Sequence, residues 1–344
     1  MKYTFIKIAV LTSFTCGLFI TQSCKKEDQL SGPLEKTTKS GILSISELTA
    51  SNMVSTVAGV PNSPGFADGT ARTAHFNTPL GIQMITDGTL YIADKNNNAI
   101  RKLTSDGNVT TLNLKAPENF PVQGPTSVGI DNAGSVHILS YLVDQAGLSY
   151  IFDKNGVFVA GDGNTYTGLG ALAKDPYEDF FWFSEYVIIE KHIANTNGST
   201  GRDIVPFNSS LLNSNERGRG SSFRGLFVGR NKVIYFATDS RIFKYTPGGV
   251  TAQLYPDFKF KRITSLVLNA DSRSMYLASE GQIFKIENGK LTLLARPNSA
   301  TPDGRDGVGL KADVHAFSLA LGDHENSLYF SDNVTNTIRK IMLK

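Results

Sequence analysis

The sequence predicts an all-β fold, a six-bladed β-propeller, on three observations. A segment near the start of the chain is repeated near its end, turn signals recur at a regular interval, and the chain stops one strand short of a complete last blade. We expect the propeller to span residues 54–344. A signal segment over 1–23 and a tether over 24–53 precede it.

Composition fits a folded, turn-rich chain. The 344 residues are 40% hydrophobic and 19% charged, and 32 of them are glycine. The formal net charge is only +3, from 34 basic and 31 acidic residues. Because this charge offers no basic excess to displace the counterions of a nucleic acid, we expect no nucleic-acid partner.

The repeat appears when the sequence is shifted by 238 positions. Residues 66–103 then align with 304–341 without a gap, and ten of 38 positions are identical. The identical positions include an aspartate, an asparagine and an arginine in each copy: Asp94, Asn98 and Arg101, then Asp332, Asn336 and Arg339. Such groups either ligate a metal or substrate, or tie a loop by accepting backbone N–H bonds while the arginine pairs with a carboxylate. A single axial site rarely needs the same trio twice, so we expect a structural role.

Turns containing glycine set the period of the blades. Asn-Gly, Asp-Gly and Gly-Gly pairs supply the positive φ angles that tight hairpins need. The second residues of these pairs are 107, 156, 198, 249 and 289, which gives spacings of 49, 42, 51 and 40. Short β-branched and aromatic runs lie between them. Four short strands in roughly 45 residues are typical of one propeller blade.

The last blade lacks its outermost strand. A sixth turn would fall at position 345, and the chain stops at Lys344. The segment Val54–Gly59 ends in Val-Ala-Gly, as the outer strand at Val159–Gly161 does. We therefore expect Val54–Gly59 to complete the last blade and close the ring, which pairs edges that invite aggregation.

The first blade also resembles an NHL repeat. The resemblance rests on Val54–Gly59, Phe66–Gly69, Phe76–Ile82, Leu90–Asp94, Asn98 and Ile100–Lys102, and the last blade repeats this signature more loosely. Blades two to five keep only the strand pattern. The resemblance implies a six-bladed propeller from a family that includes binding scaffolds and a few lyases.

The start of the chain predicts secretion and a lipid anchor. Lys2 and Lys7 precede an apolar stretch, Ile8–Ile20, and Cys24 follows it. At about 1.5 Å per residue the stretch is too short for a bilayer core of about 30 Å, which indicates a secretory signal. The position of Cys24 resembles the lipobox of bacterial lipoproteins, and this implies lipidation of Cys24. The alternative is a simple secretory signal with an incidental cysteine.

The four residues after Cys24 are two lysines followed by two acids. They resemble the export signal that sends lipoproteins of one Gram-negative group to the outer face of the outer membrane. A generic polar tether is the alternative. We expect an outer-membrane lipoprotein that is exposed on the cell surface and held to the membrane by its lipid.

An aromatic and acidic run over 177–186 marks the third blade. Strand alternation could turn half of these rings outward beside carboxylates, as in proteins that stack rings on sugars. The alternative is packing between blades. Loops over 162–170 and 208–222 could extend a binding surface, and the candidate ligand-binding residues are Tyr166, Tyr177, Trp182, Tyr186, Arg217 and Arg219.

These features favour non-catalytic binding of a glycan or a partner protein. The sequence has no Gly-x-Ser-x-Gly motif, so we assign no catalytic residue, metal ligand or cofactor. One alternative is a metal-assisted lyase or lactonase in the central channel, with His75 and His315 approaching each other across adjacent blades. Another is a scaffold subunit of an envelope complex.

Overall fold

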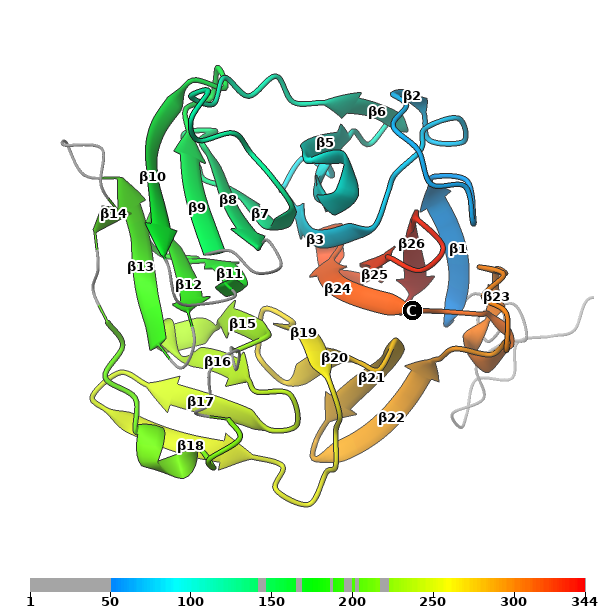
Figure 1. The fold of residues 1–344 in the computed structure, drawn as a ribbon. Coiled ribbons are helices and arrows are strands. Elements are labelled where there is room, and N and C mark those ends of the chain that lie inside the picture. The colour runs from blue at the N-terminus through cyan, green and yellow to red at the C-terminus, as the bar shows by residue number, and fades with distance from the viewer. Residues whose placement is uncertain are drawn as a thin grey trace, which may run out of the picture. The chain divides into compact units, whose positions relative to one another are not determined.

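A ring of six antiparallel sheets forms the fold, which confirms the predicted all-β, six-bladed propeller (Figure 1). The computed structural model describes residues 51–141, 147–164, 169–185, 188–194, 200–201, 204–216 and 223–343. Within these ranges no helix is long and apolar enough to cross a membrane. The predicted signal, the lipidated Cys24 and all of the predicted tether except residues 51–53 lie outside these ranges, so these features stay predictions.

Blades one to three follow one another along the chain. In each, the four main strands run from the innermost to the outermost, and the short β2 of blade one precedes them. Blade one contains β3 (Pro79–Met84), β4 (Leu90–Asp94), β5 (Ala99–Leu103), β6 (Asn108–Thr111) and the short β2 (Gly69–Thr70). Blade two contains β7 (Pro125–Ile130), β8 (Val136–Tyr141), β9 (Gly147–Phe152) and β10 (Phe158–Asn164). Blade three contains β11 (Leu169–Lys174), β12 (Phe181–Glu185), β13 (Ile188–Ala194) and β14 (Thr200–Gly201).

Blades four to six complete the ring. Blade four contains β15 (Gly225–Val228), β16 (Ile234–Ala237), β17 (Ile242–Thr246) and β18 (Val250–Leu254). Blade five contains β19 (Ile263–Leu268), β20 (Ser274–Ser279), β21 (Gln282–Glu287) and β22 (Lys290–Ala295). Blade six contains β24 (Ala316–Leu321), β25 (Ser327–Asp332), β26 (Thr337–Met342), β1 (Met53–Ala58) and β23 (Gly307–Val308). Short 3-10 turns lie at η1 (Lys95–Asn97), η2 (Ser209–Leu211), η3 (Arg230–Lys232), η4 (Gly309–Lys311) and η5 (Asp323–Glu325).

The turn glycines have the backbone conformation that the sequence predicts. Gly107, Gly156, Gly249 and Gly289 have φ angles of 86°, 74°, 98° and 74°. Each closes a hairpin between the third and fourth strands of its blade. The predicted turn at Asn197-Gly198 lies outside the described residues.

The N-terminal strand β1 pairs antiparallel with β26 at the C-terminal end of the chain. Val54 lies opposite Ile341 and Thr56 opposite Arg339. In blade one, Thr111 of β6 lies opposite Arg101 of β5 in the same way. Thus β1 has in blade six the place that β6 has in blade one.

The apolar core lies between the blades. One cluster joins Phe76 and Ile92 of blade one to Ile338 of blade six, and another joins Ile100 of blade one to Ile138 of blade two. Each sheet therefore has a neighbouring blade on both of its faces, so residues on both sides of a strand are buried.

Candidate functional site

The aromatic run of blade three is mostly core. Phe181 and Phe183 on one face of β12 are 2% and 4% exposed, and Phe180 is 6% exposed. Trp182, on the other face, packs against a cluster between blades three and four that includes Phe236. The rings of β12 therefore pack between blades, as the alternative interpretation expects, because neighbouring blades cover both faces of this strand.

Tyr177 and Trp182 are held by their own turn. The buried Asp175 carboxylate accepts hydrogen bonds from the Tyr177 amide at 2.8 Å and from Trp182 Nε1 at 2.9 Å. Tyr177 is 53% exposed, and its hydroxyl accepts a bond from the Asn231 amide at 2.9 Å. A ligand-binding role for these two residues stays a prediction. The other candidates, Tyr166, Tyr186, Arg217 and Arg219, lie outside the described residues.

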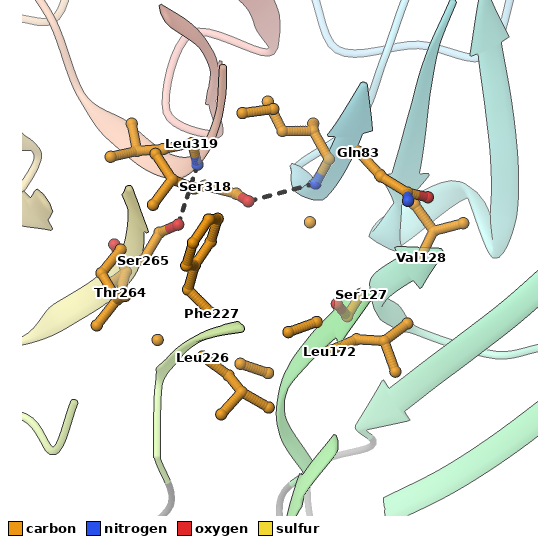
Figure 2. A pocket seen from close by; sticks show the side chains of 18 of the residues that line it. Gln83, Ser127, Val128, Leu172, Leu226, Phe227, Thr264, Ser265, Ser318 and Leu319 are labelled. Carbon is orange, nitrogen blue, oxygen red and sulfur yellow. Dashed lines mark hydrogen bonds between the residues drawn. The ribbon is translucent and has the colours of Figure 1, made fainter. Parts of the chain in front are cut away.

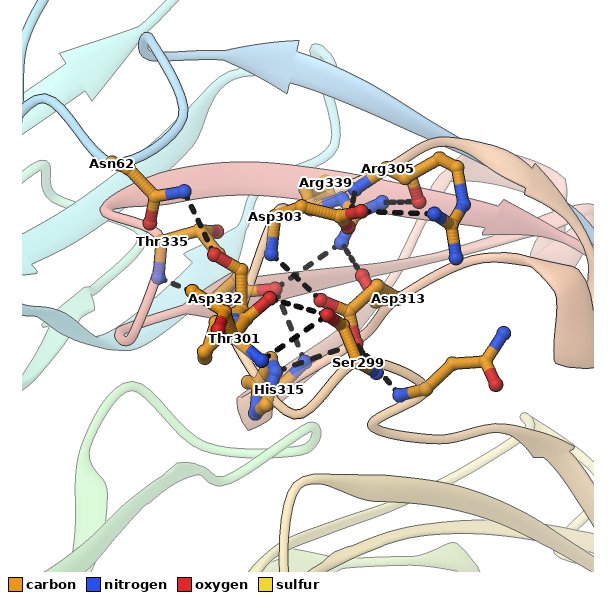
Figure 3. A network of polar contacts seen from close by, with 12 residues as sticks. Asn62, Ser299, Thr301, Asp303, Arg305, Asp313, His315, Asp332, Thr335 and Arg339 are labelled. Atoms are coloured by element: carbon orange, nitrogen blue, oxygen red, sulfur yellow. Dashed lines mark hydrogen bonds and ion pairs between the residues drawn. The ribbon is translucent and has the colours of Figure 1, made fainter.

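The repeated polar set has the same geometry in both blades, as a structural role requires. Arg101 Nη1 donates to Asp94 Oδ2 at 2.8 Å, and Arg339 Nη1 donates to Asp332 Oδ2 at 3.2 Å. Both arginines are fully buried. Their Nη2 atoms donate to equivalent aspartates, Asp68 at 2.7 Å and Asp306 at 3.0 Å, and to backbone carbonyls. Figure 3 shows Arg339 with Asp332 in blade six.

The asparagines of this set join each blade to the next. Asn98 Oδ1 accepts the Gly124 amide at 2.8 Å, just before β7, and Asn336 Oδ1 accepts the Thr78 amide at 2.8 Å, just before β3. Their φ angles are 53° and 61°, in the left-handed region that asparagine tolerates. Asparagine therefore provides both the backbone turn and the bond to the next blade.

A second aspartate organises the loop that leads into blade six. Asp313 accepts the backbone amides of Asn298 and Asp303 at 2.7 and 2.9 Å (Figure 3). Burial raises the pKa of this carboxyl, but these hydrogen bonds outweigh it, so the pKa lies below its usual value. The loop is thus folded around an ionised carboxylate.

The two histidines of the enzyme alternative are each held within their own blade. His75 Nδ1 hydrogen-bonds to the Ser63 carbonyl at 2.9 Å, and His315 Nε2 lies 3.5 Å from Asp313 Oδ1. In the described part of the chain, no group of three or more His, Cys, Asp or Glu residues could hold a metal ion.

A different histidine pair connects blades two and three. His137 Nδ1 lies 3.3 Å from His192 Nδ1, and His137 Nε2 lies 3.3 Å from Asp131 Oδ2. Burial and the neighbouring His137 lower the pKa of His192 well below its usual value. Sequence inspection missed this pair because its members are 55 positions apart, in blades that share no polar repeat.

A central cavity of about 770 Å³ lies where the six innermost strands meet (Figure 2). Strand register aligns the lining residues in layers. One layer holds six small residues: Gly81, Ser127, Ala171, Gly225, Ser265 and Ser318. The next layer holds six aliphatic residues: Ile82, Val128, Leu172, Leu226, Leu266 and Leu319.

Small residues are needed where neighbouring blades come closest. A Cβ atom on Gly81 would lie 2.6 Å from the Thr126 carbonyl oxygen and 2.7 Å from Ser127 Cα. Both contacts are with the backbone of the next blade, which cannot move aside as a flexible side chain can. This layer therefore fixes the width of the cavity.

The serines of this layer keep hydrogen-bond donors for the cavity. Ser265 Oγ accepts the Leu319 amide at 3.1 Å, and Ser318 Oγ accepts the Ile82 amide at 3.3 Å (Figure 2). A hydroxyl has one hydrogen to donate beyond its two acceptor lone pairs. Both hydroxyl hydrogens remain available, and the Ser127 hydroxyl has no hydrogen-bond partner among the described residues. The Phe227 ring points into the same space.

Charged residues line the cavity at both ends. Lys95, in η1, and Arg224, just before β15, lie at the opening where the innermost strands begin, called here the strand-start opening. Lys174 and Glu325 lie at the opposite, strand-end opening. At that end Lys174 Nζ pairs with Asp179 at 2.6 Å, and Glu325 accepts the Ala270 amide.

No family profile matches the sequence, and no curated protein is similar to it. Solved structures are similar in fold. A protein of unknown function from Bacteroides thetaiotaomicron has a TM-score of 0.65 at 17% identity, over 84% of this chain and 75% of that chain. An auxiliary nutrient binding protein from Bacteroides ovatus has a TM-score of 0.59 at 15% identity, over 84% and 76%.

An enzyme is also similar in fold. A catalytically inactive virginiamycin B lyase from Staphylococcus aureus, solved with quinupristin, has a TM-score of 0.52 at 13% identity, over 81% of this chain and 99% of that chain. At such identities the likenesses show the propeller fold alone. The resemblance to NHL repeats stays a prediction.

Proposed function

We propose that this protein is a lipid-anchored propeller of the bacterial envelope that binds a glycan, without catalysis, in its central cavity. The cavity itself carries the proposal. Its volume of about 770 Å³ lies within the range of about 300–1,000 Å³ that is common for ligand pockets. The fold likeness to an auxiliary nutrient binding protein supports it.

The lining matches the two surfaces of a sugar. Sugar rings have apolar faces and a hydroxyl rim, so they favour aliphatic and aromatic contacts with hydrogen-bonding groups between them. The apolar contacts would come from Leu172, Leu226 and Phe227. The hydrogen-bonding groups would be the hydroxyls of Ser127 and Ser318.

Binding is tested by calorimetry on the full chain in detergent, with neutral and acidic oligosaccharides. We expect one glycan class to bind, and Ser127→Leu to weaken its binding at least tenfold by filling the cavity. Thr110→Leu, at an exposed position on β6, is the matched control and should bind normally. Binding that Ser127→Leu leaves intact would place the ligand elsewhere. Chemical conversion of a bound glycan would favour the enzyme alternative.

The envelope location rests on Cys24, which follows a short apolar stretch. Two acyl chains suffice for stable membrane anchoring, so a fully acylated cysteine would hold the protein at the membrane. Cys24→Ala should move the protein from the membrane fraction to the soluble fraction. Protease treatment of intact cells should degrade the wild-type protein if it faces the medium. Retention of Cys24→Ala in the membrane contradicts the lipid anchor.

A further inference from the structure

Two cations line the strand-start opening from opposite sides of the ring. Lys95 belongs to blade one and Arg224 to blade four, which lie across the ring from each other (Figure 1). Among the described residues, the Lys95 ammonium has no ion-pair or hydrogen-bond partner. Arg224 pairs with Asp239 at 3.5 Å, and the two side chains are 46% and 65% exposed. An exposed pair of this kind is held weakly, so Arg224 can turn to a ligand.

The positive charge at this opening is not matched by acids of the lining. Of the described residues that line the cavity, Glu325 is the one carboxylate, and it lies at the strand-end opening. A cleft lined by charge of one sign concentrates ligands of the opposite sign.

The serine layer lies deeper, below these cations. Its hydroxyl hydrogens can donate to oxygen atoms that bear negative charge, and such hydrogen bonds are shorter and stronger than neutral ones. This arrangement fits a polyhydroxylated molecule that carries a carboxylate. The lysine and arginine at the opening can pair with the carboxylate, and the hydroxyl donors within the cavity can bind its other oxygen atoms.

We infer that the ligand is an acidic saccharide, a short uronate chain, whose carboxylates contact Lys95 and Arg224 while its rings enter the cavity. This inference rests on the proposed function and adds the charge of the ligand to it. A neutral glycan would bind the same cavity without using the two cations.

The test compares probes that differ in charge and otherwise only by a methyl group. The full chain in detergent is titrated with dimers and trimers of galacturonate and mannuronate, and with the methyl esters of the same oligomers. We expect one acid to bind about tenfold more tightly than its ester at an ionic strength of about 0.01 M, where the Debye length is about 30 Å. The preference should nearly vanish at about 1 M, where that length is about 3 Å.

Variants assign this preference to the two cations. Lys95→Met with Arg224→Gln should bind acid and ester alike, at the affinity of wild type for the ester, whereas Arg224→Lys should keep most of the preference. Equal binding of acid and ester by wild type overturns this inference and leaves glycan binding standing. A preference that survives the double substitution also overturns it. Failure of every acidic and neutral oligosaccharide to bind overturns both proposals.

Discussion

Thr56 and Asp306, 250 positions apart, are joined by two hydrogen bonds: the Thr56 amide donates to Oδ2 at 2.9 Å and its hydroxyl to Oδ1 at 3.0 Å. In blade one, Thr111 makes the same two bonds to Asp68, at 3.1 and 2.9 Å. The same pair of threonine–aspartate hydrogen bonds thus holds the N-terminal strand in blade six and the outer strand β6 in blade one. Both aspartates also accept from the buried arginine of their blade.

Removing the N-terminal strand should destabilise the whole ring. A chain that begins at Val60 lacks β1, whereas a chain that begins at Ser51 keeps it. We expect the shorter chain to lose a large part of the about 5–15 kcal/mol that is typical of a folded domain, because β26 then has a free edge. Urea unfolding measures this difference. A peptide of residues 51–59 added to the shorter chain should raise its midpoint, and equal midpoints for the two chains contradict the prediction.

Replacing the buried arginine of blade one or of blade six should lower the free energy of unfolding by similar, large amounts. Arg101→Met leaves the buried Asp94 carboxylate without its cation, which typically costs about 3–5 kcal/mol. Arg339→Met should cost a similar amount, because Asp332 is buried in the same way. Arg101→Lys keeps the charge but loses the two-pronged geometry, so its cost should be smaller. Denaturant unfolding gives the values, and an unchanged midpoint for Arg101→Met would rule out this role.

Blades one and six share the same polar residues at the same spacing, and this similarity made the fold predictable from the sequence. Asp94, Asn98 and Arg101 recur at identical spacing in the last blade, so their structural role and the propeller fold follow from self-similarity. Trp182 could not be placed in the same way. Period-two alternation predicts one solvated face, but here each sheet is covered on both faces by its neighbours. A central channel follows from the propeller fold, but its lining residues escaped prediction, since small residues such as Ser265 form it without any distinctive motif.

Adding one methyl group at the closest approach of two blades should destabilise the ring. Gly81→Ala places a Cβ atom 2.6 Å from a backbone oxygen of blade two, and such overpacking typically costs about 1–3 kcal/mol. Gly163→Ala is the matched control, because its Cβ would lie 3.4 Å from Leu148 in ordinary contact. The control should change the free energy of unfolding by less than about 1 kcal/mol. If both substitutions lower the free energy of unfolding equally, the close approach of the two blades at Gly81 does not require a glycine there.

The histidine pair between blades two and three should make stability depend on pH. Burial raises the pKa of Asp131, but hydrogen bonds from His137 and Ser135 outweigh it, so its carboxylate is ionised and accepts from His137 Nε2–H. His137 Nδ1 then accepts from His192 Nδ1–H, which leaves His192 Nε2 unprotonated, buried and without a partner among the described residues. A proton added to His192 would have no acceptor.

Because the folded-state pKa of His192 lies well below 6.5, the unfolded chain binds one more proton once the pH falls below that value. Stability is therefore lost on acidification, by up to about 1.4 kcal/mol per pH unit. Urea titrations between about pH 5.5 and 7 measure this slope, above the range in which most carboxylates titrate. His192→Gln, even if less stable at neutral pH, should lower the slope by about one proton, whereas Thr110→Asn, at an exposed position without a titratable group, should leave it unchanged. An equal slope in wild type and His192→Gln would show that another group binds the proton.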